Sequence, residues 1–217
     1  MRLLLIDTSG PVCAAAIYDA EADSLLSARS ETIGKGHAEL LPVMVGEIVA
    51  ESGVPLADLD RIAVTIGPGS FTGIRVGVAM ARGFAVALGK PAVGVSTLRI
   101  VAESVLEIGP PAPVMAVLDA KRDEVYAQIF SPVGEALTEP AAYDYATAKA
   151  AASRFQAIVI GSGAGLLDGG QSGGPDVFPL LAIGRIAMRL DEDDHASPLY
   201  IRGADAKPQI GFAVQHA

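Results

Sequence analysis

The chain has 217 residues, of which 51% are apolar, enough for one large domain or two small ones with a packed core. Its 25 acidic residues outnumber its 16 basic ones, and the net charge of −9 argues against a chain that binds nucleic acid by itself. A single cysteine, Cys13, excludes an internal disulfide and fits a reducing compartment. Asp7 interrupts the short N-terminal apolar run, and no uncharged run approaches the ~18 residues of a membrane span. We therefore expect a cytoplasmic protein without a membrane anchor.

The first half of the chain alternates apolar runs with turn residues. Apolar runs at 2–9, 12–19 and 24–31 are joined by short connections, which predicts three antiparallel strands. The elements that we predict next are a helix over 34–52 ending at Gly53, a strand over 61–67, a helix over 70–88, a strand over 91–96 and a helix over 96–108. This order is that of a ribonuclease-H-like α/β lobe, in which right-handed crossovers make the later strands parallel.

The second half begins, after a Gly- and Pro-rich linker at 109–113, with a short repeat of the first. Residues 114–131 align without a gap under residues 2–19 at a constant offset of 112, which places Asp119 under Asp7. Both segments have the pattern strand, aspartate, turn, strand, so we predict a duplicated fold.

The remainder of the second half predicts fewer elements than the first half has. These are a helix near 144–153, a strand over 157–161, a glycine-rich loop over 161–174 and a helix near 180–190. We therefore divide the chain into a first lobe, 1–108, and a reduced second lobe, 109–217. The lobe on which the tail 204–217 packs is left open.

An aspartate at the end of the first strand of each half suggests an actin-like or Hsp70-like ATPase architecture. In such proteins carboxylates at strand ends hold a magnesium–phosphate group, and turn glycines let backbone N–H groups approach it. Asp7, Thr8 and Ser9 would form the first such turn, with Asp119 opposite. The stretch "GPGSFTG" (67–73) follows a later strand.

The glycines of that stretch do not satisfy either common phosphate motif. A Walker A loop needs Gly-x4-Gly-Lys-Ser/Thr, whereas five residues separate Gly67 from Gly73, and Ile74 follows. The dinucleotide motif Gly-x-Gly-x-x-Gly fits Gly67 and Gly69 but meets Thr72 at its third glycine. We therefore interpret the stretch as a turn with a helix cap, and the four residues named above as a degenerate nucleotide-site remnant.

Small residues recur every four positions in the helix that follows. Gly73, Gly77 and Ala81 lie on one face. An interior glycine lowers helix stability by about 1 kcal/mol relative to alanine, so we expect a compensating interaction at this face. One interpretation is close packing inside the chain, on the sheet or on the helix over 37–52. The other is a subunit interface made by the helices over 37–52 and 70–88.

The sequence offers no metal or nucleophile motif, so we predict no catalytic residue and no metal ligand in this chain. Its three histidines, His37, His195 and His216, form neither an HxxxH nor an HExxH pair. No G-x-S-x-G elbow is present. His37 precedes an amphipathic helix, where it is interpreted as a cap or an interface residue.

The sequence resembles the TsaB (YeaZ) family of tRNA threonylcarbamoyladenosine biosynthesis proteins over nearly its whole length. The matching segments, in the family's order, are "LLLIDTS", "GHAELLPV", "GPGSFTGIRVGVAMARGFA", "GVSTL", "LDAKRDEVY" and "SPLYIRGADAKPQ". The resemblance implies a two-lobed actin-like ATPase fold, α/β and duplicated, with a reduced second lobe. It also implies a paralogue of the catalytic subunit TsaD that lacks the HxxxH metal pair, since "VGVSTLRIVAESV" contains no histidine.

By this resemblance the chain is a non-catalytic subunit that binds and activates a TsaD-like catalytic subunit. That complex, with a TsaE-like ATPase, transfers threonylcarbamoyl to N6 of an adenosine in tRNA. ATP, ADP and the metal would belong to the partners, tRNA would be met only through the complex, and the chain alone would form a homodimer. The residues implied at the TsaD or homodimer interface are His37, Leu40, Leu41, Met44, Gly73, Gly77, Met80 and Ala81. Two alternatives are an independent ATPase or small-molecule kinase and, least favoured by the charge, direct tRNA binding.

Overall fold

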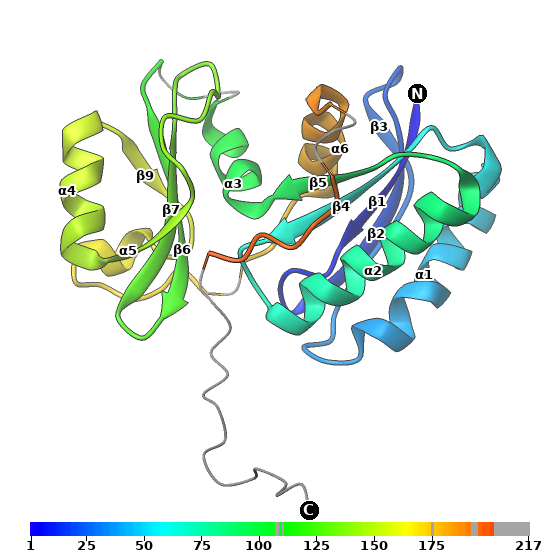
Figure 1. Ribbon diagram of the computed structural model, residues 1–217, viewed down its shortest axis with the longest axis horizontal. Coiled ribbons are helices and arrows are strands. Elements are labelled where there is room, and N and C mark those ends of the chain that lie inside the picture. The colour runs from blue at the N-terminus through cyan, green and yellow to red at the C-terminus, as the bar shows by residue number, and fades with distance from the viewer. Residues whose placement is uncertain (107–108, 110, 175, 192–194, 202–217) are drawn as a thin grey trace, which may run out of the picture.

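In the computed structural model two α/β lobes lie side by side, each built on one sheet (Figure 1). The structure describes the whole chain except residues 107–108, 110, 175, 192–194 and 202–217. The tail 204–217, whose packing the sequence left open, lies outside the described residues.

The sheet of the first lobe has the strand order β3-β2-β1-β4-β5. Its strands are β1 (Arg2–Asp7), β2 (Val12–Asp19), β3 (Ser24–Thr32), β4 (Arg61–Gly67) and β5 (Ala92–Ser96). β2 pairs antiparallel with β1 and β3, whereas β4 pairs parallel with β1 and β5. The predicted meander and the predicted parallel crossovers of a ribonuclease-H-like lobe are both confirmed.

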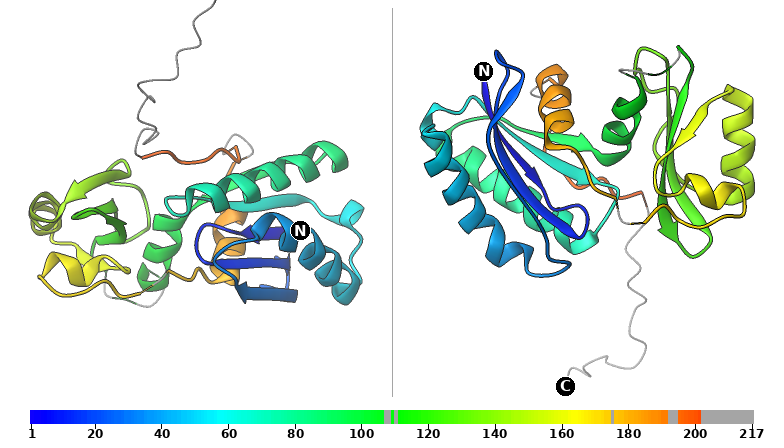
Figure 2. Two further views of the ribbon diagram at one scale, coloured as in Figure 1. Left: turned by 90° about the horizontal axis from the view of Figure 1, so that it is seen from below. Right: turned by 180° about the vertical axis from the view of Figure 1, so that it is seen from behind.

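Helices cover both faces of this sheet, as Figure 2 shows. α1 (His37–Ser52) and α2 (Phe71–Leu88) lie on one face, while α3 (Thr97–Leu106) and α6 (Leu180–Arg189) lie on the other. A one-turn 3-10 helix (Leu56–Asp58) precedes β4. Because both faces are covered, β1 and β2 are buried almost throughout, and the apolar side chains alternate between two separate cores.

Both helices on the first face end where the sequence predicts, and α2 begins within one residue of its predicted start, whereas α1 begins at His37 and not at residue 34. Ser70 precedes α2, and its Oγ accepts a hydrogen bond from the Gly73 N–H at 3.2 Å. Gly53 follows α1 in the left-handed conformation, with φ 67°, and its N–H donates to the Val49 carbonyl.

The second sheet has the order β8-β7-β6-β9, the same order as the first four strands of the first sheet. Its strands are β6 (Val114–Lys121), β7 (Glu124–Phe130), β8 (Ala141–Asp144) and β9 (Ile158–Ile160). β6 pairs antiparallel with β7 and parallel with β9. Helices α4 (Tyr145–Phe155) and α5 (Ala164–Leu167) accompany this sheet. The fold is thus duplicated and its second half reduced, as predicted, although β8 was not foreseen.

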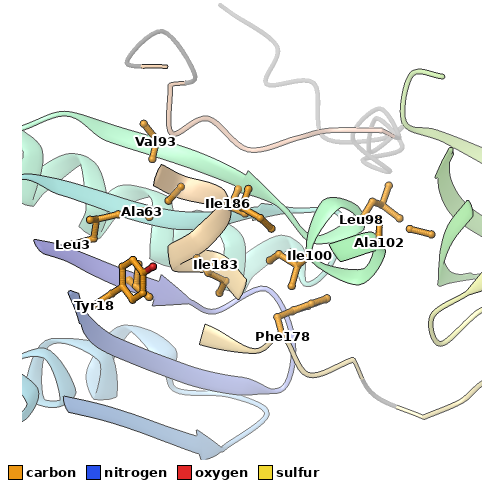
Figure 3. Close-up of a cluster of buried hydrophobic side chains, with 14 of the residues drawn as sticks. Leu3, Tyr18, Ala63, Val93, Leu98, Ile100, Ala102, Phe178, Ile183 and Ile186 are labelled. Carbon is orange, nitrogen blue, oxygen red and sulfur yellow. The ribbon is translucent and has the colours of Figure 1, made fainter. Parts of the chain in front are cut away.

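The predicted division at 109–217 needs one amendment, because the chain after the second sheet returns to the first lobe. Ile183 and Ile186 of α6 pack into a core with Leu3 and Tyr18 of the first sheet (Figure 3). The Arg61 Nη1 group of β4 donates to two carbonyl oxygens at the end of α6, at 2.6 and 2.8 Å. By its contacts α6 therefore belongs to the first lobe.

The two lobes also share buried side chains. The core in Figure 3 continues from the first sheet through α3 to Leu118 and Phe130 of the second sheet. At this junction Glu103 of α3 is only 3% exposed and is paired with Arg99 and with Arg189 of α6. Arg99 also donates to the Gly134 carbonyl, which follows β7 in the second lobe. The shared core and the Arg99–Gly134 hydrogen bond thus join the two lobes through α3.

Candidate functional site: the cleft between the lobes and the outer face of α2

A cavity of about 470 Å³ lies between the lobes, and the ends of β1, β4 and β6 line it. From the first lobe the cavity is lined by Ser9, Gly10, Pro11, Gly34, Pro68, Gly69 and Ser70. From the second lobe and the segment after it, the lining residues are Leu118, Asp119, Ala120, Lys121, Tyr126, Ser162, Gly174, Asp176 and Phe178. A nucleotide remnant would be expected in this position, because carboxyl ends of neighbouring strands meet there. The predicted remnant residues are not all on its surface.

Asp7 lies beneath the cleft and is 2% exposed. Its Oδ1 accepts three hydrogen bonds, from the Ser9 N–H at 3.0 Å, the Ser9 hydroxyl at 2.6 Å and the Thr65 hydroxyl at 2.7 Å. Burial raises the pKa of Asp7, and these hydrogen bonds oppose that change. The carboxylate therefore holds the turn after β1 together.

The glycine-rich turn closes on that same turn. Thr8 is fully buried, and its hydroxyl donates to the Gly73 carbonyl at 2.8 Å. The Ser70 N–H donates to the Ser9 carbonyl at 2.6 Å. A Cβ on Gly69 or on Gly73 would lie closer than 3.0 Å to a backbone oxygen of this turn. These glycines thus permit two backbone segments to touch, which supports the interpretation of a turn with a helix cap.

On the opposite wall Asp119 is engaged by its own hairpin. The Lys121 N–H donates to Asp119 Oδ1 at 2.8 Å, and the Lys121 ammonium lies 2.5 Å from Oδ2. Burial alone would raise the pKa of Asp119, but the hydrogen bonds and charge of Lys121 outweigh it and hold the pKa below its usual value. Nearby, the Ser162 hydroxyl donates to Asp176 at 2.8 Å. Of the four predicted remnant residues, Ser9 and Asp119 line the cleft, while Asp7 and Thr8 do not.

Asparagine at position 7 is expected to raise the free energy of unfolding at pH 7.5. The amide oxygen of asparagine can accept the three hydrogen bonds that Asp7 Oδ1 accepts from Ser9 and Thr65. The substitution also removes the buried negative charge of the carboxylate. A carboxyl whose pKa is raised on folding stabilises the fold below its unfolded pKa, near 3.8, and loses that contribution as pH rises through the folded pKa. The gain from Asp7→Asn should therefore shrink at pH 4, as urea unfolding at both pH values would show. An equal gain in the free energy of unfolding at both pH values, or a loss at pH 7.5, would contradict this prediction.

Most residues predicted at a subunit interface are buried inside the chain. Those with less than 9% exposure are His37, Leu41, Met44, Gly73, Gly77 and Ala81. A Cβ on Gly77 would lie closer than 3.0 Å to the Thr8 hydroxyl oxygen, so the small-residue face packs on β1 and its turn. These contacts support internal packing, one of the two interpretations left open for this face, and the interface assignment of its residues stays a prediction. Leu40 and Met80 are partly exposed and remain interface predictions.

The opposite face of the same two helices is exposed and combines small and apolar side chains with charged ones, among them Arg75 and Arg82 of α2. On α2 it presents Ala79, Gly83 and Val86, the last of them 86% exposed, and on α1 it presents Val43, 57% exposed. A Cβ on Gly83 would have no atom within 4 Å. α2 has the length and hydropathy of a membrane span, with 18 residues and a mean hydropathy of 1.4, yet its other face packs on the first sheet.

The sequence contained a signal for this outer face that the prediction did not use. Ala79 and Gly83 are four residues apart, as are Gly73 and Gly77, so α2 carries two faces of small residues. Spacing alone does not say which face meets the sheet. The side chains of Ile74 and Val78, which lie beside the first face, identify it as the internal one.

Two lobes of the same strand order, joined across one cleft with an aspartate near the end of each first strand, define a protein of the actin-like ATPase fold. A solved structure, YeaZ from Pseudomonas aeruginosa, superposes on 92% of this chain and 99% of its own, with a TM-score of 0.68 and 27% identity.

The family model described as "TsaD: tRNA N6-adenosine threonylcarbamoyltransferase" matches residues 30–163. The chain is 36% identical over 126 residues to the tRNA threonylcarbamoyladenosine biosynthesis protein TsaB of Escherichia coli. The aligned segment covers 58% of this chain and 53% of that protein. It is 31% identical over 210 residues to an uncharacterized protein of Mycobacterium tuberculosis, covering 95% and 94% of the two chains. The match thus spans about half the length of the TsaB relatives. The chain belongs to the TsaD family, on the branch that holds the TsaB (YeaZ) proteins.

Proposed function

We propose that this chain is the non-catalytic partner subunit in bacterial tRNA N6-threonylcarbamoyladenosine synthesis, where it binds and activates a TsaD-like catalytic subunit. The observation that carries the proposal is the exposed face of α2, where Gly83 and Val86 lie uncovered beside Arg75 and Arg82. Exposed apolar surface of this kind marks a place where another protein packs. The TsaB relatives named above supply the pathway.

The cleft supports a subunit without catalysis of its own. Asp7 accepts a hydrogen bond from Thr65 of β4, and Thr8 donates one to Gly73 of α2, so both side chains are used within the fold. Lys121 lies against Asp119, where a cation would otherwise be drawn. No group of three His, Cys, Asp or Glu side chains with metal-binding geometry occurs among the residues that the structure describes. As part of the same proposal, nucleotide and metal belong to the partners, including a TsaE-like ATPase, and tRNA is met through the complex.

Arginine at position 83 is expected to weaken association with the TsaD-like subunit at least about tenfold, because a charged side chain would be forced into the apolar contact. Gly83 has open space around it, so Gly83→Arg should fold normally. Ala150→Arg, at an exposed position inside α4 of the second lobe, makes the same kind of change away from the surface. Light scattering coupled to size exclusion, with a purified TsaD-like subunit, measures the effect.

Two controls sharpen that experiment. Gly77→Arg is unsuitable as an interface probe, because position 77 faces Thr8 and the change would unfold the lobe. In a reconstituted modification assay Gly83→Arg should lose activity in step with binding. A folded Gly83→Arg protein that binds and supports modification like the unchanged chain would refute the proposed interface. We also propose that two copies pair through this face when the TsaD-like subunit is absent.

The cleft keeps one other function open, that of an independent ATPase or small-molecule kinase. Its volume of about 470 Å³ is that of a small-molecule site. Calorimetry with Mg-ATP on the isolated chain separates the two functions, and we expect no binding in the micromolar range. Micromolar binding with turnover, in the absence of any partner, would favour the enzyme.

A further inference from the structure

The first sheet ends at β3, whose outer edge has no neighbouring strand among the described residues (Figure 2). The Ile33 N–H donates to the Pro11 carbonyl at 3.0 Å, one step beyond the pairing of Thr32 with Val12. Hydrogen-bonded and non-hydrogen-bonded pairs alternate along an antiparallel ladder, so every second residue of β3 directs its N–H and C=O away from β2. These residues are Ala28, Ser30 and Thr32.

A contact of Arg29 agrees with this direction and closes part of the edge. The Arg29 Nη1 group donates to the Ala28 carbonyl at 3.0 Å and lies 2.7 Å from the Glu51 carboxylate of α1. Ser30 and Thr32 are exposed, and their outward N–H and C=O groups have no partner within the described part of the chain. The edge therefore presents a row of main-chain donors and acceptors, of which Arg29 covers one acceptor.

Acidic side chains flank this edge on the side of α1. Arg29 and Glu31 point to that side, because their partners in β2, Ala15 and Cys13, lie in the core beneath α1. Arg29 is paired there with Glu47 and Glu51, whereas Glu31 makes no ion pair within the part of the chain that the structure describes. Residues 24–52, which form β3 and α1, include four glutamates against one arginine and one lysine.

The opposite face of the same edge is apolar. Leu25 and Ala28 are partly buried there and pack against the core that α6 covers. A strand added at the edge would place alternate side chains against these two faces, since successive side chains of a strand point to opposite sides. The edge therefore suits a strand with basic residues on one side and apolar residues on the other.

We propose that the outer edge of β3 binds an extended segment of a partner protein in which lysine or arginine alternates with apolar residues. The segment adds antiparallel to β3, and its main chain bonds to Ser30 and Thr32. Its cations meet Glu31 and, once Arg29 moves aside, Glu51. The proposal goes beyond the proposed function and does not depend on it, because α1 packs on β2 and β3 while α2 packs on β1 and β4.

A second copy of this chain fits the edge less well. Antiparallel pairing of β3 with itself about Ser30 would place Arg29 opposite Glu31 of the other copy, which is favourable. The same arrangement would also gather Glu31, Glu47 and Glu51 of both copies around only two arginines, so repulsion between carboxylates dominates. The same carboxylates would repel the phosphates of a nucleic acid.

A short peptide tests strand addition without any change to the protein. The probe is the acetylated and amidated peptide Thr-Lys-Val-Lys-Val-Lys-Thr, titrated against the full chain by calorimetry at about 50 mM salt. In antiparallel addition the valine N–H groups face β3 and the lysine N–H groups face away. N-methylation of the valines should therefore weaken binding at least about tenfold, whereas N-methylation of the lysines should leave it within about twofold. Glutamate in place of the lysines should abolish binding.

Two substitutions in the chain test the charged side chains. Glu31→Gln should weaken binding of the lysine peptide about fivefold, because its cation partner is lost. Arg29→Ala should strengthen binding about fivefold, because the Ala28 carbonyl and Glu51 become available. Glu139→Gln, at an exposed position of the second lobe, should leave binding unchanged, and urea unfolding shows that each variant folds. Unchanged binding by Arg29→Ala would refute the competition between Arg29 and the added segment.

Hydrogen exchange followed by NMR locates the bound peptide. The amides of Ser30 and Thr32 should exchange more slowly when the peptide is present. Equal binding of the two N-methylated peptides, binding of the glutamate peptide, or unchanged exchange at these amides would overturn the proposal. Absence of binding at peptide concentrations up to about 1 mM would overturn it as well. Self-association of the chain that Ser30→Pro abolishes would assign the edge to a second copy and would likewise overturn it.

Discussion

Replacing Gly73 by alanine is expected to lower the free energy of unfolding by about 3 kcal/mol or more. A Cβ at this position would overlap the backbone carbonyl oxygen of Thr8. That carbonyl belongs to a turn which the buried Asp7 carboxylate fixes, and the Thr8 hydroxyl in turn donates to the Gly73 carbonyl. Neither backbone segment has room to move, so relief of the overlap would break these hydrogen bonds.

Gly83→Ala in the same helix is the matched control. No atom lies within 4 Å of a Cβ at position 83, so alanine should stabilise α2 by about 0.5–1 kcal/mol through helix propensity alone. Urea unfolding followed by far-UV circular dichroism measures both variants. Equal effects of the two substitutions would contradict the assignment of an internal face to Gly73 and an external face to Gly83.

Replacing Glu103 by alanine is expected to lower the free energy of unfolding by about 3 kcal/mol, because two arginines at the lobe junction lose their shared carboxylate. Glu103 is 3% exposed, pairs with Arg99 and Arg189, and holds Arg99 where it reaches the Gly134 carbonyl. The change should also loosen the lobes, which a spin-label distance across the cleft would report as a broader distribution.

The control for that change is Asp168→Ala, which removes an exposed ion pair with Lys149 on the second lobe. It should cost no more than about 0.5 kcal/mol and leave the distance distribution unchanged. Glu103→Gln keeps the shape and some hydrogen bonds, so its cost should lie between the two. A Glu103→Ala protein as stable as the Asp168→Ala protein would show that the junction does not depend on this carboxylate.

Local signals predicted most of the fold. Turn residues and helical spacing located the elements from β1 to α3 to within a few residues, because Gly53 and Ser70 end and begin helices by backbone chemistry that the sequence shows. β8 was missed because only four residues of moderate burial form it, as an edge strand beside β7. The parallel direction of the later strands followed from crossover rules rather than from any single residue.

The internal repeat predicted the duplicated fold, but its ungapped alignment differs by one residue from the strand pairing. Leu5 pairs with Ala16 in the first lobe, and the offset of 112 would pair Val117 with Gln128. The structure pairs Val117 with Ala127, so nine residues separate this pair, whereas ten separate Leu5 from Ala16. A slip of one residue exchanges the faces of a strand, so an ungapped alignment did not report which side chains of β7 are internal.

The site was predicted less well than the fold, because it depends on contacts between distant residues. Nothing near Arg61 in the sequence shows that its guanidinium would meet the end of α6, about 126 positions later. Periodicity grouped Gly73 with Gly77 correctly, but the direction in which the group faces depends on β1 and its turn. The second small-residue face, at Ala79 and Gly83, became visible only once the first was assigned.

The return of α6 to the first lobe bears on the order in which the protein is made. Leu3, Leu5 and Tyr18 lie on a side of the first sheet that α6 covers, and α6 follows the whole of the second lobe in the chain. On the ribosome only α3 is available to cover that side at first, and α6 follows after the second lobe, from Val114 to Leu167, has been made. The first lobe therefore begins to form early but is completed only when α6 has been made. Until then its exposed apolar side is prone to aggregation.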